Sequence, residues 1–376
     1  MNSLRILGTR GIPAAHGGFE TFAERLALYL VHRGWSVTVY CQEEGAGAVF
    51  EDHWQGVRRV HVPVPGDGPR ATVAFDWRAT RHAAREPGLC LTLGYNTAVF
   101  CGWLRWAGLR NAINMDGIEW RRAKWSWAAK AWLRINEFAG CHLGNQLVAD
   151  HPEIERHLLA TARADKITMI PYGADRLQDK PSAPVQALGL EPGRYLTLIA
   201  RAEPENSVLE VVQAFARRPR GLQLAVLGNL RQDNAYHRAV RAAAAAAPAE
   251  VRLLGAIYDP PVVQSLRVHS LAYVHGHQVG GTNPSLVEAL GAGNAVIAHD
   301  NRFNRWVLGA SARYFESAND LAGVFDGVLG DAAALAEMRE GSLARFEHTF
   351  TWPVILAAYE AMLLRLAGRV EARPEG

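Results

Sequence analysis

The sequence predicts an α/β fold with two doubly wound, Rossmann-like domains, and three observations point to it. Short apolar runs typical of buried strands alternate with amphipathic segments along most of the chain. A stretch rich in Pro, Gly, Asp and Gln at residues 173–193 separates two such series. The length of 376 residues suits two domains of about 100–200 residues each. Sheets of this class bind ligands outside the carboxyl ends of their strands, so two halves facing each other would hold a ligand in the cleft between them.

The first half begins with a βαβ unit, the building block of a parallel sheet. Residues 4–8 (LRILG) are expected to form a buried strand, residues 19–33 an amphipathic helix and residues 36–40 (SVTVY) the next strand. Gly34 is placed to end the helix as its C′ residue. A further helix is expected at 123–139. Further strands are expected at 57–63, 89–94, 111–115, 146–150 and 166–171.

The second half repeats this alternation from Tyr195 onward. Strands are expected at 195–200, 222–228, 251–255, 271–276 and 295–299. Helices are expected at 207–218, in an alanine-rich run ending near 247, and at 285–291, 319–347 and 352–367. Strands that alternate with helices in this way predict a second parallel sheet.

Composition and charge exclude several classes of protein. The net charge of +3 is too small to indicate nucleic-acid binding. The four cysteines form no CxxC pair and have no zinc-like spacing, so we expect buried or free thiols and no metal site. No apolar stretch reaches the roughly 18 residues of a membrane span, and the N-terminus lacks the core of a signal peptide. We expect a cytoplasmic protein, or one held peripherally at the inner face of the cytoplasmic membrane.

The glycine-rich loop over residues 8–18 is a candidate phosphate-binding loop. Glycines such as Gly17 and Gly18 let backbone N–H groups approach an anion, and the helix that follows directs its positive end toward it. The loop lacks both the G-x-G-x-x-G dinucleotide pattern and a P-loop lysine. The alternative is a tight turn between strand and helix.

A second candidate anion site follows the strand expected at 271–276. Backbone amides of Gly281, Thr282, Asn283 and Ser285 would lie at a helix N-terminus, where a diphosphate binds well. Glu288, one turn into that helix, could accept hydrogen bonds from two ribose hydroxyls. The alternative is a capped helix with a solvent-facing carboxylate.

Two acidic residues follow the strand expected at 111–115. Asp116 and Glu119 should lie at the ligand edge of the first sheet, where they could orient donor or acceptor hydroxyls or accept a proton. The alternative is a helix N-cap and a first-turn acid. Arg201, after the first strand of the second half, could reach diphosphate oxygens with its planar fork, or could be a surface residue.

Six of the eleven tryptophans lie within residues 103–134, among basic side chains. Tryptophan and cations together suit a membrane interface with anionic lipids. The alternative is core tryptophan plus solvated charge. The candidate acceptor or membrane patch consists of Trp120, Arg121, Arg122, Lys124 and Trp125.

Three separated motifs resemble glycosyltransferase family four, the retaining GT-B enzymes. They are GTRGIP…GGFET at residues 8–21, MDG-E-W at 115–120 and HGH…GGTNPSL-EA at 275–289. The closer resemblance is to a bacterial branch that includes rhamnosyltransferases of capsule and polysaccharide assembly. It spans nearly the whole chain, with the motifs in the same order.

The resemblance implies a GT-B architecture, with two Rossmann-like doubly wound domains facing across a cleft. We expect an N-terminal acceptor-side domain at 1–172, a C-terminal nucleotide-sugar-binding domain at 173–351, and a C-terminal helix at 352–376 that packs back on the N-terminal domain.

The resemblance also assigns roles to residues of the donor site. It implies that the donor diphosphate is bound by Gly17, Gly18 and Arg201, and by the amides of the loop from Gly281 to Ser285. It implies that Glu288 binds the nucleotide ribose. Two positions depart from the family pattern: Gly280 stands where the first Glu of E-x7-E would fall, and Asn206 stands where a Lys is usual.

The implied reaction is transfer of a sugar with retained configuration from a nucleoside diphosphate to a hydroxyl. The best candidate donor is dTDP-rhamnose, followed by UDP- and GDP-sugars. The candidate acceptor is a glycan or lipid-linked oligosaccharide of cell-surface polysaccharide synthesis: capsule, exopolysaccharide or lipopolysaccharide. No metal or other cofactor is expected, and Asp116 and Glu119 are the candidate catalytic or positioning residues.

Three other functions stay open from the sequence. A GT-B sugar-nucleotide epimerase or hydrolase would act without an acceptor. A nicotinamide-dependent oxidoreductase would need the missing G-x-G-x-x-G pattern. A non-catalytic sugar-binding partner would bind nucleotide weakly and show no turnover.

Overall fold

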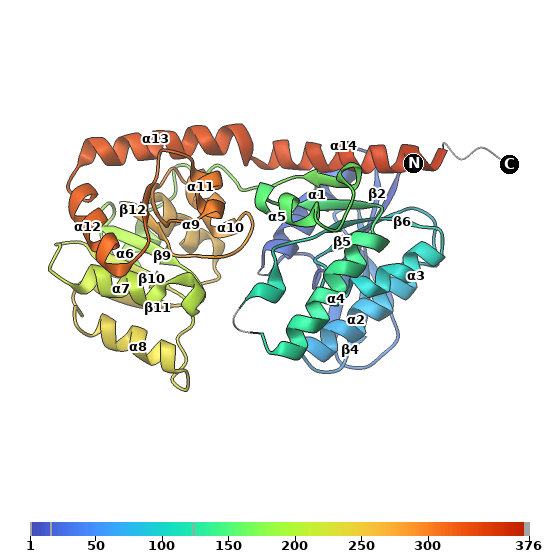
Figure 1. Cartoon of the computed structure of the whole chain (residues 1–376), viewed down its shortest axis with the longest axis horizontal. Helices are drawn as coiled ribbons and strands as arrows, with labels where there is room; N and C mark the ends of the chain where they lie inside the picture. The colour runs from blue at the N-terminus through green and yellow to red at the C-terminus, as the bar shows by residue number, and fades with distance from the viewer. Residues whose placement is uncertain (1, 16, 123–124, 372–376) are drawn as a thin grey trace. The chain divides into compact units, whose positions relative to one another are not determined.

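The computed structural model describes residues 2–15, 17–122 and 125–371. The chain divides into two compact units, each built around its own sheet (Figure 1). Unit 1 consists of Met1–Tyr172 together with Trp352–Gly376, and unit 2 consists of Gly173–Thr351.

Unit 1 contains an eight-stranded sheet in the order β3-β4-β2-β1-β5-β6-β7-β8. All neighbouring pairs are parallel except β3 and β4. Its strands are β1 (Ser3–Leu7), β2 (Ser36–Glu44), β3 (Phe50–Trp54), β4 (Val57–Val64), β5 (Leu89–Leu93), β6 (Arg110–Asn114), β7 (Gln146–Ala149) and β8 (Ile167–Met169). The central strands are apolar because helices cover both faces of a parallel sheet.

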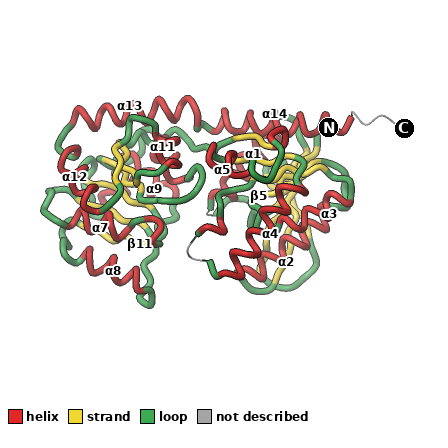
Figure 2. Tube along the Cα trace, viewed as in Figure 1, coloured by secondary structure: helices red, strands yellow, loops and turns green. Residues whose placement is uncertain are grey.

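Helices of unit 1 connect these strands (Figure 2). They are α1 (Gly18–His32), α2 (Gly68–Ala83), α3 (Cys101–Trp106), α4 (Trp127–Leu143), α5 (Pro152–Leu158) and α14 (Trp352–Glu371), with short 3₁₀ turns η1 (Ala98–Phe100), η2 (Glu119–Arg121) and η3 (Ala164–Lys166). α1 ends as expected: Arg33 is its C-cap and Gly34, with φ of 82°, follows it.

The C-terminal helix α14 belongs to the core of unit 1. Its residue Tyr359 packs on Phe22 of α1 with ring centroids 4.6 Å apart. The Tyr359 hydroxyl accepts a hydrogen bond from Asn114 Nδ2 at 2.9 Å. The carboxylate of Glu360 accepts from Tyr29 and Trp35 at 3.0 and 3.3 Å. α14 therefore covers one face of the first sheet, although 179 residues of sequence (173–351) separate it from the rest of unit 1.

Unit 2 contains a six-stranded, fully parallel sheet in the order β11-β10-β9-β12-β13-β14. Its strands are β9 (Tyr195–Ile199), β10 (Gln223–Leu227), β11 (Val251–Gly255), β12 (Ala272–His275), β13 (Ala295–His299) and β14 (Arg313–Phe315). Its helices are α6 (Ala183–Ala187), η4 (Pro204–Asn206), α7 (Val208–Ala216), α8 (Ala235–Ala244), α9 (Pro260–Val268), α10 (Pro284–Gly291), α11 (Arg302–Leu308), α12 (Ala318–Val328) and α13 (Ala332–Thr349).

The predicted α/β class is confirmed, and the structure differs from it in local detail. The single helix expected at 319–347 is two helices, α12 and α13. Asp331 separates them because its side chain accepts from Ala334 N and starts a new helix. The predicted linker at 173–193 contains the short helix α6. The edge strand β3 and helix α2 were not predicted, since β3 is mostly exposed and α2 is rich in charge.

Candidate functional site

The glycine-rich loop after β1 is held by two carboxylates of α1. The Arg10 amide donates to Glu20 Oε1 at 3.1 Å, and the Ala14 amide donates to Glu24 Oε2 at 2.6 Å. Gly17 has φ of 105°, and a Cβ there would overlap Glu20 Oε2. The positive φ favours glycine at 17, and an anion at this loop would meet the charge of Glu20.

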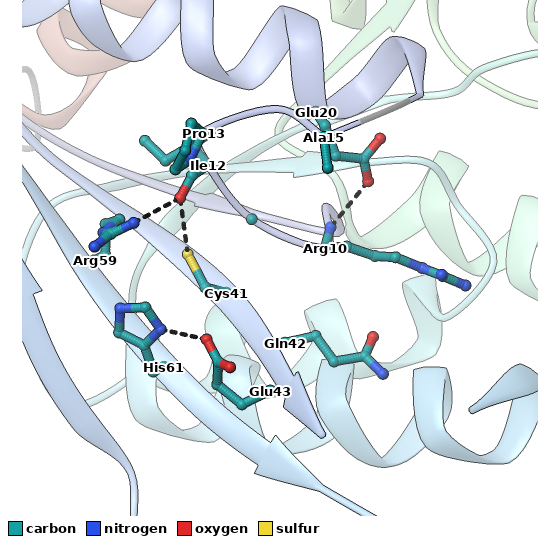
Figure 3. A pocket seen from close by; sticks show the side chains of 11 residues that line it. Arg10, Ile12, Pro13, Ala15, Glu20, Cys41, Gln42, Glu43, Arg59 and His61 are labelled. Carbon is teal, nitrogen blue, oxygen red and sulfur yellow. Dashed lines mark hydrogen bonds and ion pairs between the residues drawn. The ribbon is translucent and has the colours of Figure 1, made fainter. Parts of the chain in front are cut away.

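Beside this loop lies a first pocket, called pocket A and shown in Figure 3. Arg59 donates to the carbonyl of Ile12 at 3.0 Å, and the Cys41 thiol points at the same oxygen. The His61 ring lies 2.6 Å from Glu43 through Nδ1 and 3.0 Å from Asp52 through Nε2. Arg59, His61 and Glu43 of pocket A are thus engaged by other groups of the protein. Its lining residues are Arg10, Gly11, Ile12, Pro13, Ala15, Glu20, Cys41, Gln42, Glu43, Arg59 and His61.

A second pocket, called pocket B, lies at the carboxyl ends of three neighbouring strands, β2, β1 and β5, and encloses about 250 Å³. This is the edge at which doubly wound sheets bind ligands. Its lining combines polar side chains with Phe75, Leu93 and two glycines. The lining residues are Gly8, Thr9, Arg10, Glu20, Gln42, Thr72, Phe75, Asp76, Leu93, Gly94, Asn96 and Thr97.

Asp76 of α2 is the buried carboxyl group of pocket B. Burial raises its pKa to about 6, and the hydrogen bond from Thr97 Oγ1 to Asp76 Oδ2 at 2.7 Å opposes that rise. A carboxyl that titrates near neutrality can accept or donate a hydrogen bond. Together with the amides of Gln42 and Asn96, it suits a ligand rich in hydroxyl groups. The sequence analysis missed Asp76 because it missed α2.

Asp116 and Glu119 both lie just beyond β6, at the same edge of the sheet. Asp116 has φ of 49°, and its amide donates to Asn114 Oδ1 at 2.9 Å. The Glu119 carboxylate is paired with Arg122 at 2.8 Å and accepts from Trp125 Nε1 at 3.4 Å. The Glu119 amide donates to the Tyr95 hydroxyl at 2.9 Å. Glu119 is therefore anchored by its own segment and by Tyr95, which follows β5.

The predicted Trp/basic patch is largely engaged in internal contacts. Trp120 donates from Nε1 to Glu137 Oε2 at 2.9 Å. The guanidinium groups of Arg121 and Arg134 lie 5.1 and 5.0 Å from its ring centroid. Arg122 and Trp125 contact Glu119 as described above, and Lys124 lies outside the described residues.

In unit 2, the loop after β9 carries Arg201 and Asn206. Arg201 is exposed, and its carbonyl accepts from Asn206 Nδ2 at 2.8 Å. Asn206 is 1% exposed, and its Oδ1 has no hydrogen-bond partner among the described residues. Gln278, in the segment after β12, is hydrogen-bonded to this loop twice. Its backbone amide donates to the Glu205 carbonyl and its Nε2 donates to Ser207 Oγ, both at 2.9 Å.

Helix α10 begins after the second glycine-rich segment and carries Glu288. Its N-cap Asn283 accepts from the Ser285 amide at 3.0 Å, so that amide is already bonded within the protein. Gly281 and Thr282 directly precede this cap, and Thr282 is buried.

Glu288 is fixed by a buried cation, Arg267 of α9. Arg267 Nη2 donates to Glu288 Oε2 at 2.7 Å, and the two side chains are 3% and 41% exposed. Arg267 also donates to the carbonyl and the hydroxyl of Ser285, both at 3.0 Å. The sequence analysis missed Arg267, because nothing in a lone arginine on a helix indicates its burial.

The buried ring of His275 stacks on His277 just below this segment, with centroids 4.4 Å apart. Burial, then the neighbouring His277 and Arg267, lowers the pKa of His275 well below its ordinary value. His275 is thus neutral and adds no positive charge to this edge of unit 2.

Searches for two other kinds of site were negative over the described part of the chain. In residues 2–15, 17–122 and 125–371, no three His, Cys, Asp or Glu side chains gather so that they could hold a metal ion. Nor does any helix in those ranges have the length and apolar character needed to cross a membrane.

Comparisons with known proteins give a family model and a fold. Residues 1–175 match the family model described as a domain of unknown function, DUF1972. No curated protein sequence matches the chain.

Solved structures match over nearly the whole length. Sucrose-phosphate synthase from Thermosynechococcus elongatus matches with a TM-score of 0.80 at 17% identity, over 98% of this chain and 100% of its own. Anabaena HepE in complex with UDP and glucose gives 0.77 at 14%, over 97% and 100%. A UDP-forming α,α-trehalose-phosphate synthase from Burkholderia vietnamiensis gives 0.75 at 14%, over 99% and 100%. The chain thus has the GT-B fold of these structures, as the sequence predicts.

Proposed function

We propose that the protein is a nucleotide-sugar-dependent glycosyltransferase. The observation that carries the proposal is Glu288, which is held by Arg267 beside the N-terminus of α10 at the carboxyl edge of the unit 2 sheet. A carboxylate fixed on one oxygen and partly exposed is suited to accept hydroxyl hydrogen bonds. The GT-B fold supports the proposal, because the similar structures include enzymes crystallised with UDP and glucose.

Unit 2 is the proposed donor-binding domain. Arg201 supplies an exposed guanidinium for the diphosphate, with the amides of Gly281 and Thr282 near the start of α10. Glu288 takes the ribose. Asn283 and Ser285 act chiefly by shaping this turn, since Asn283 caps the Ser285 amide. The resemblance also proposes donor contacts at Gly17 and Gly18, where a bound diphosphate would have to displace the Glu20 carboxylate.

Unit 1 is the proposed acceptor-binding domain, with pocket B as the hydroxyl-binding part. Asp76, Asn96 and Gln42 offer hydrogen-bonding groups of both kinds to a sugar. Asp116, at the end of β6, is the proposed catalytic-site carboxylate that orients a reacting hydroxyl, and Glu119 positions it through the segment they share.

The proposed reaction retains the anomeric configuration and uses no metal. The bond from the anomeric carbon to the diphosphate oxygen breaks, and a bond to the acceptor oxygen forms on the same face. The acceptor proton passes to the leaving phosphate, whose charge Arg201 and the helix amides offset. The acceptor class is a glycan or lipid-linked oligosaccharide of cell-surface polysaccharide synthesis, met in the cytoplasm or at the inner face of its membrane.

Two donor classes compete. The sequence motifs favour dTDP-rhamnose, whereas HepE was crystallised with UDP-glucose. Asn206 stands where the family usually has a lysine. Either diphosphate would therefore meet one positive charge fewer at this position.

A thermal-shift and nucleotide-release panel tests the proposal. It covers dTDP-rhamnose, UDP-glucose, UDP-galactose, UDP-N-acetylglucosamine, GDP-mannose and NADH. One sugar nucleotide should raise the Tm. At a hundredfold excess over its Kd, a ligand increases the free energy of unfolding by about 2.7 kcal/mol. Glu288→Ala should reduce the shift, and Glu337→Ala, an exposed glutamate of α13, should not. A response to NADH alone, or to none of these compounds, overturns the proposal.

A further inference from the structure

Unit 1 exposes large apolar side chains on two neighbouring helices, α3 and α4. Trp106 and Trp127 are 78% and 84% exposed, values far above those of ordinary surface tryptophans. The set is called the α3–α4 aromatic face. Its members are Trp103, Trp106, Trp127, Trp132, Ile135 and Phe138.

The helices that carry this face pack beside one another. Arg105 of α3 donates to the carbonyl of His142 of α4 at 3.2 Å. The rings of Trp103 and Trp106 lie 5.0 Å apart, and Trp77 of α2 meets Trp103 edge-on at 5.6 Å. In Figure 1, α2, α3 and α4 run beside one another on unit 1. An apolar surface shared by adjacent helices marks an interaction site rather than scattered exposed residues.

The exposed apolar residues of α4 are additional to the residues that this helix buries in the core of unit 1. Its inward side buries Leu133, Asn136, Gly140 and Cys141. The Asn136 side chain accepts from the Val99 amide at 3.0 Å, which fixes that side against η1. Trp127, Ile135 and Phe138 are exposed, and at about 100° per residue their positions lie within about 80° of one another around the helix, away from the buried side. α4 is therefore apolar on two sides, and only one of them is covered by unit 1.

The exposed charges on α2, α3 and α4 are basic. The basic residues Arg81, Arg105, Lys130 and Arg134 lie on α2, α3 and α4. Over their described residues, these helices carry two acids, Asp76 and Glu137. Asp76 is buried in pocket B, as described above. Glu137 is 13% exposed and is bound by Trp120 and by His157, which lies 3.0 Å away. The described carboxylates of these three helices are thus buried or engaged. The exposed Asp165 lies near the end of α4, where it pairs with Arg163 and adjoins Lys166, whose Nζ donates to the Cys141 carbonyl.

We propose that the α3–α4 aromatic face docks on an anionic lipid bilayer surface. Tryptophan rings settle at the depth of the headgroups, where one ring edge is apolar and the indole N–H is solvated. The basic side chains meet lipid phosphates, each contributing about 1 kcal/mol near an anionic surface. A protein partner would need carboxylates at fixed positions opposite these cations, whereas an anionic bilayer needs only exposed apolar rings beside basic side chains.

This docking would bring unit 1, with pocket B, to the surface where a lipid-linked acceptor resides. That consequence rests on the proposed transferase function, whereas the lipid contact itself does not. The predicted patch around Trp120 lies next to α4, but its aromatic rings are engaged by Glu137 and Glu119. The exposed rings come instead from residues 103–106 and 127–138.

The test is co-sedimentation of the full-length chain with vesicles of phosphatidylcholine alone or mixed with phosphatidylglycerol. Wild type should bind the anionic vesicles, and added salt should weaken that binding. The double variant Trp106→Ser/Trp127→Ser should lose at least about tenfold in binding. Lys130→Glu/Arg134→Glu should lose binding while keeping the rings. The matched control, Leu159→Ser/Leu364→Ser, removes two exposed apolar residues elsewhere on unit 1 and should bind as wild type does.

Three results overturn the proposal: no binding to anionic vesicles, equal binding by the Trp106/Trp127 variant, or a dimer at rising concentration that this variant abolishes. The last result would assign the face to a second copy of the chain. Sugar-nucleotide thermal shifts measured on the same variants report folding and donor binding. Loss of vesicle binding with an intact shift therefore separates this proposal from the proposed function.

Discussion

Arg267, almost completely buried, donates a 2.7 Å hydrogen bond from Nη2 to Oε2 of Glu288, whose side chain is 41% exposed. The pair joins α9 to α10 and sets the orientation of the carboxylate proposed to hold the ribose. A group held by a buried partner before the ligand arrives loses less freedom on binding.

Removing either member of this pair should cost both stability and nucleotide binding. Arg267→Gln should destabilise the protein by about 1–3 kcal/mol, because Ser285 and Glu288 both lose a charged donor. Glu288→Gln should cost less, since its amide oxygen can still accept from Arg267. Urea denaturation of both single variants and the double variant should show coupling of about 0.5–3 kcal/mol. Strictly additive effects would mean that the ion pair contributes nothing.

Asp76→Asn should stabilise the protein above pH 6 and have little effect at pH 4. The pKa of Asp76 is raised in the folded state from 3.8 to about 6. An acid with a raised folded pKa holds its proton more tightly in the folded state, so wild type loses stability as the pH rises from about 4 to about 6. The asparagine variant should avoid that loss, which is at most about 3 kcal/mol for a two-unit shift.

Denaturation midpoints at pH 4 and pH 8 measure the effect of Asp76→Asn, and Thr97→Val is the companion variant. The Thr97 hydroxyl lowers the pKa of Asp76, so its removal should raise that pKa further. Thr97→Val should therefore lose more stability between pH 4 and pH 8 than wild type does. A stability difference between Asp76→Asn and wild type that is the same at both pH values would contradict the raised pKa.

Two substitutions at Asp116 can distinguish the role of its carboxylate charge from the effect of its left-handed backbone conformation. With φ of 49°, position 116 is left-handed, a region that Asn tolerates and Ala does not. Asp116→Asn should stay within about 0.5 kcal/mol of wild type, whereas Asp116→Ala should cost about 1 kcal/mol. If the carboxylate positions a hydroxyl, sugar transfer should fall strongly in both variants. Transfer by Asp116→Asn at the wild-type rate would remove Asp116 from the proposed site.

Gly276→Ala should disturb the donor edge of unit 2. A Cβ at 276 would overlap the carbonyl oxygen of Asn206, so η4 and the segment after β12 would have to separate. We expect a lower Tm and a weaker thermal shift with the sugar nucleotide. Gly323→Ala, in α12 with open space around its Cβ, is the matched control and should raise stability by about 0.5–1 kcal/mol. Equal behaviour of the two variants would contradict the close approach.

The sequence alone determined the class of fold and the places where glycine-rich loops meet helices. Apolar runs marked the central strands of both sheets, because strands buried on both faces leave no polar positions. The helix expected at 285–291 agrees with α10 (Pro284–Gly291) to within one residue, since a helix N-terminus depends on residues adjacent in the chain. β3 was not readable because it is a mostly exposed edge strand, and α2 was not readable because its buried side packs on residues distant in sequence.

Only the tertiary structure decided which charged groups are neutralised and which aromatic rings are exposed. Arg267 and Glu288 lie 21 residues apart, and Asp76 and Thr97 also lie 21 residues apart. Their pairing follows from helices packing beside strand ends, which no local pattern encodes. Six tryptophans occur between residues 103 and 134, and the sequence treats them alike. Packing against unit 1 covers some of these rings and leaves Trp106 and Trp127 in solvent, because burial is a property of the surface that a neighbouring element supplies.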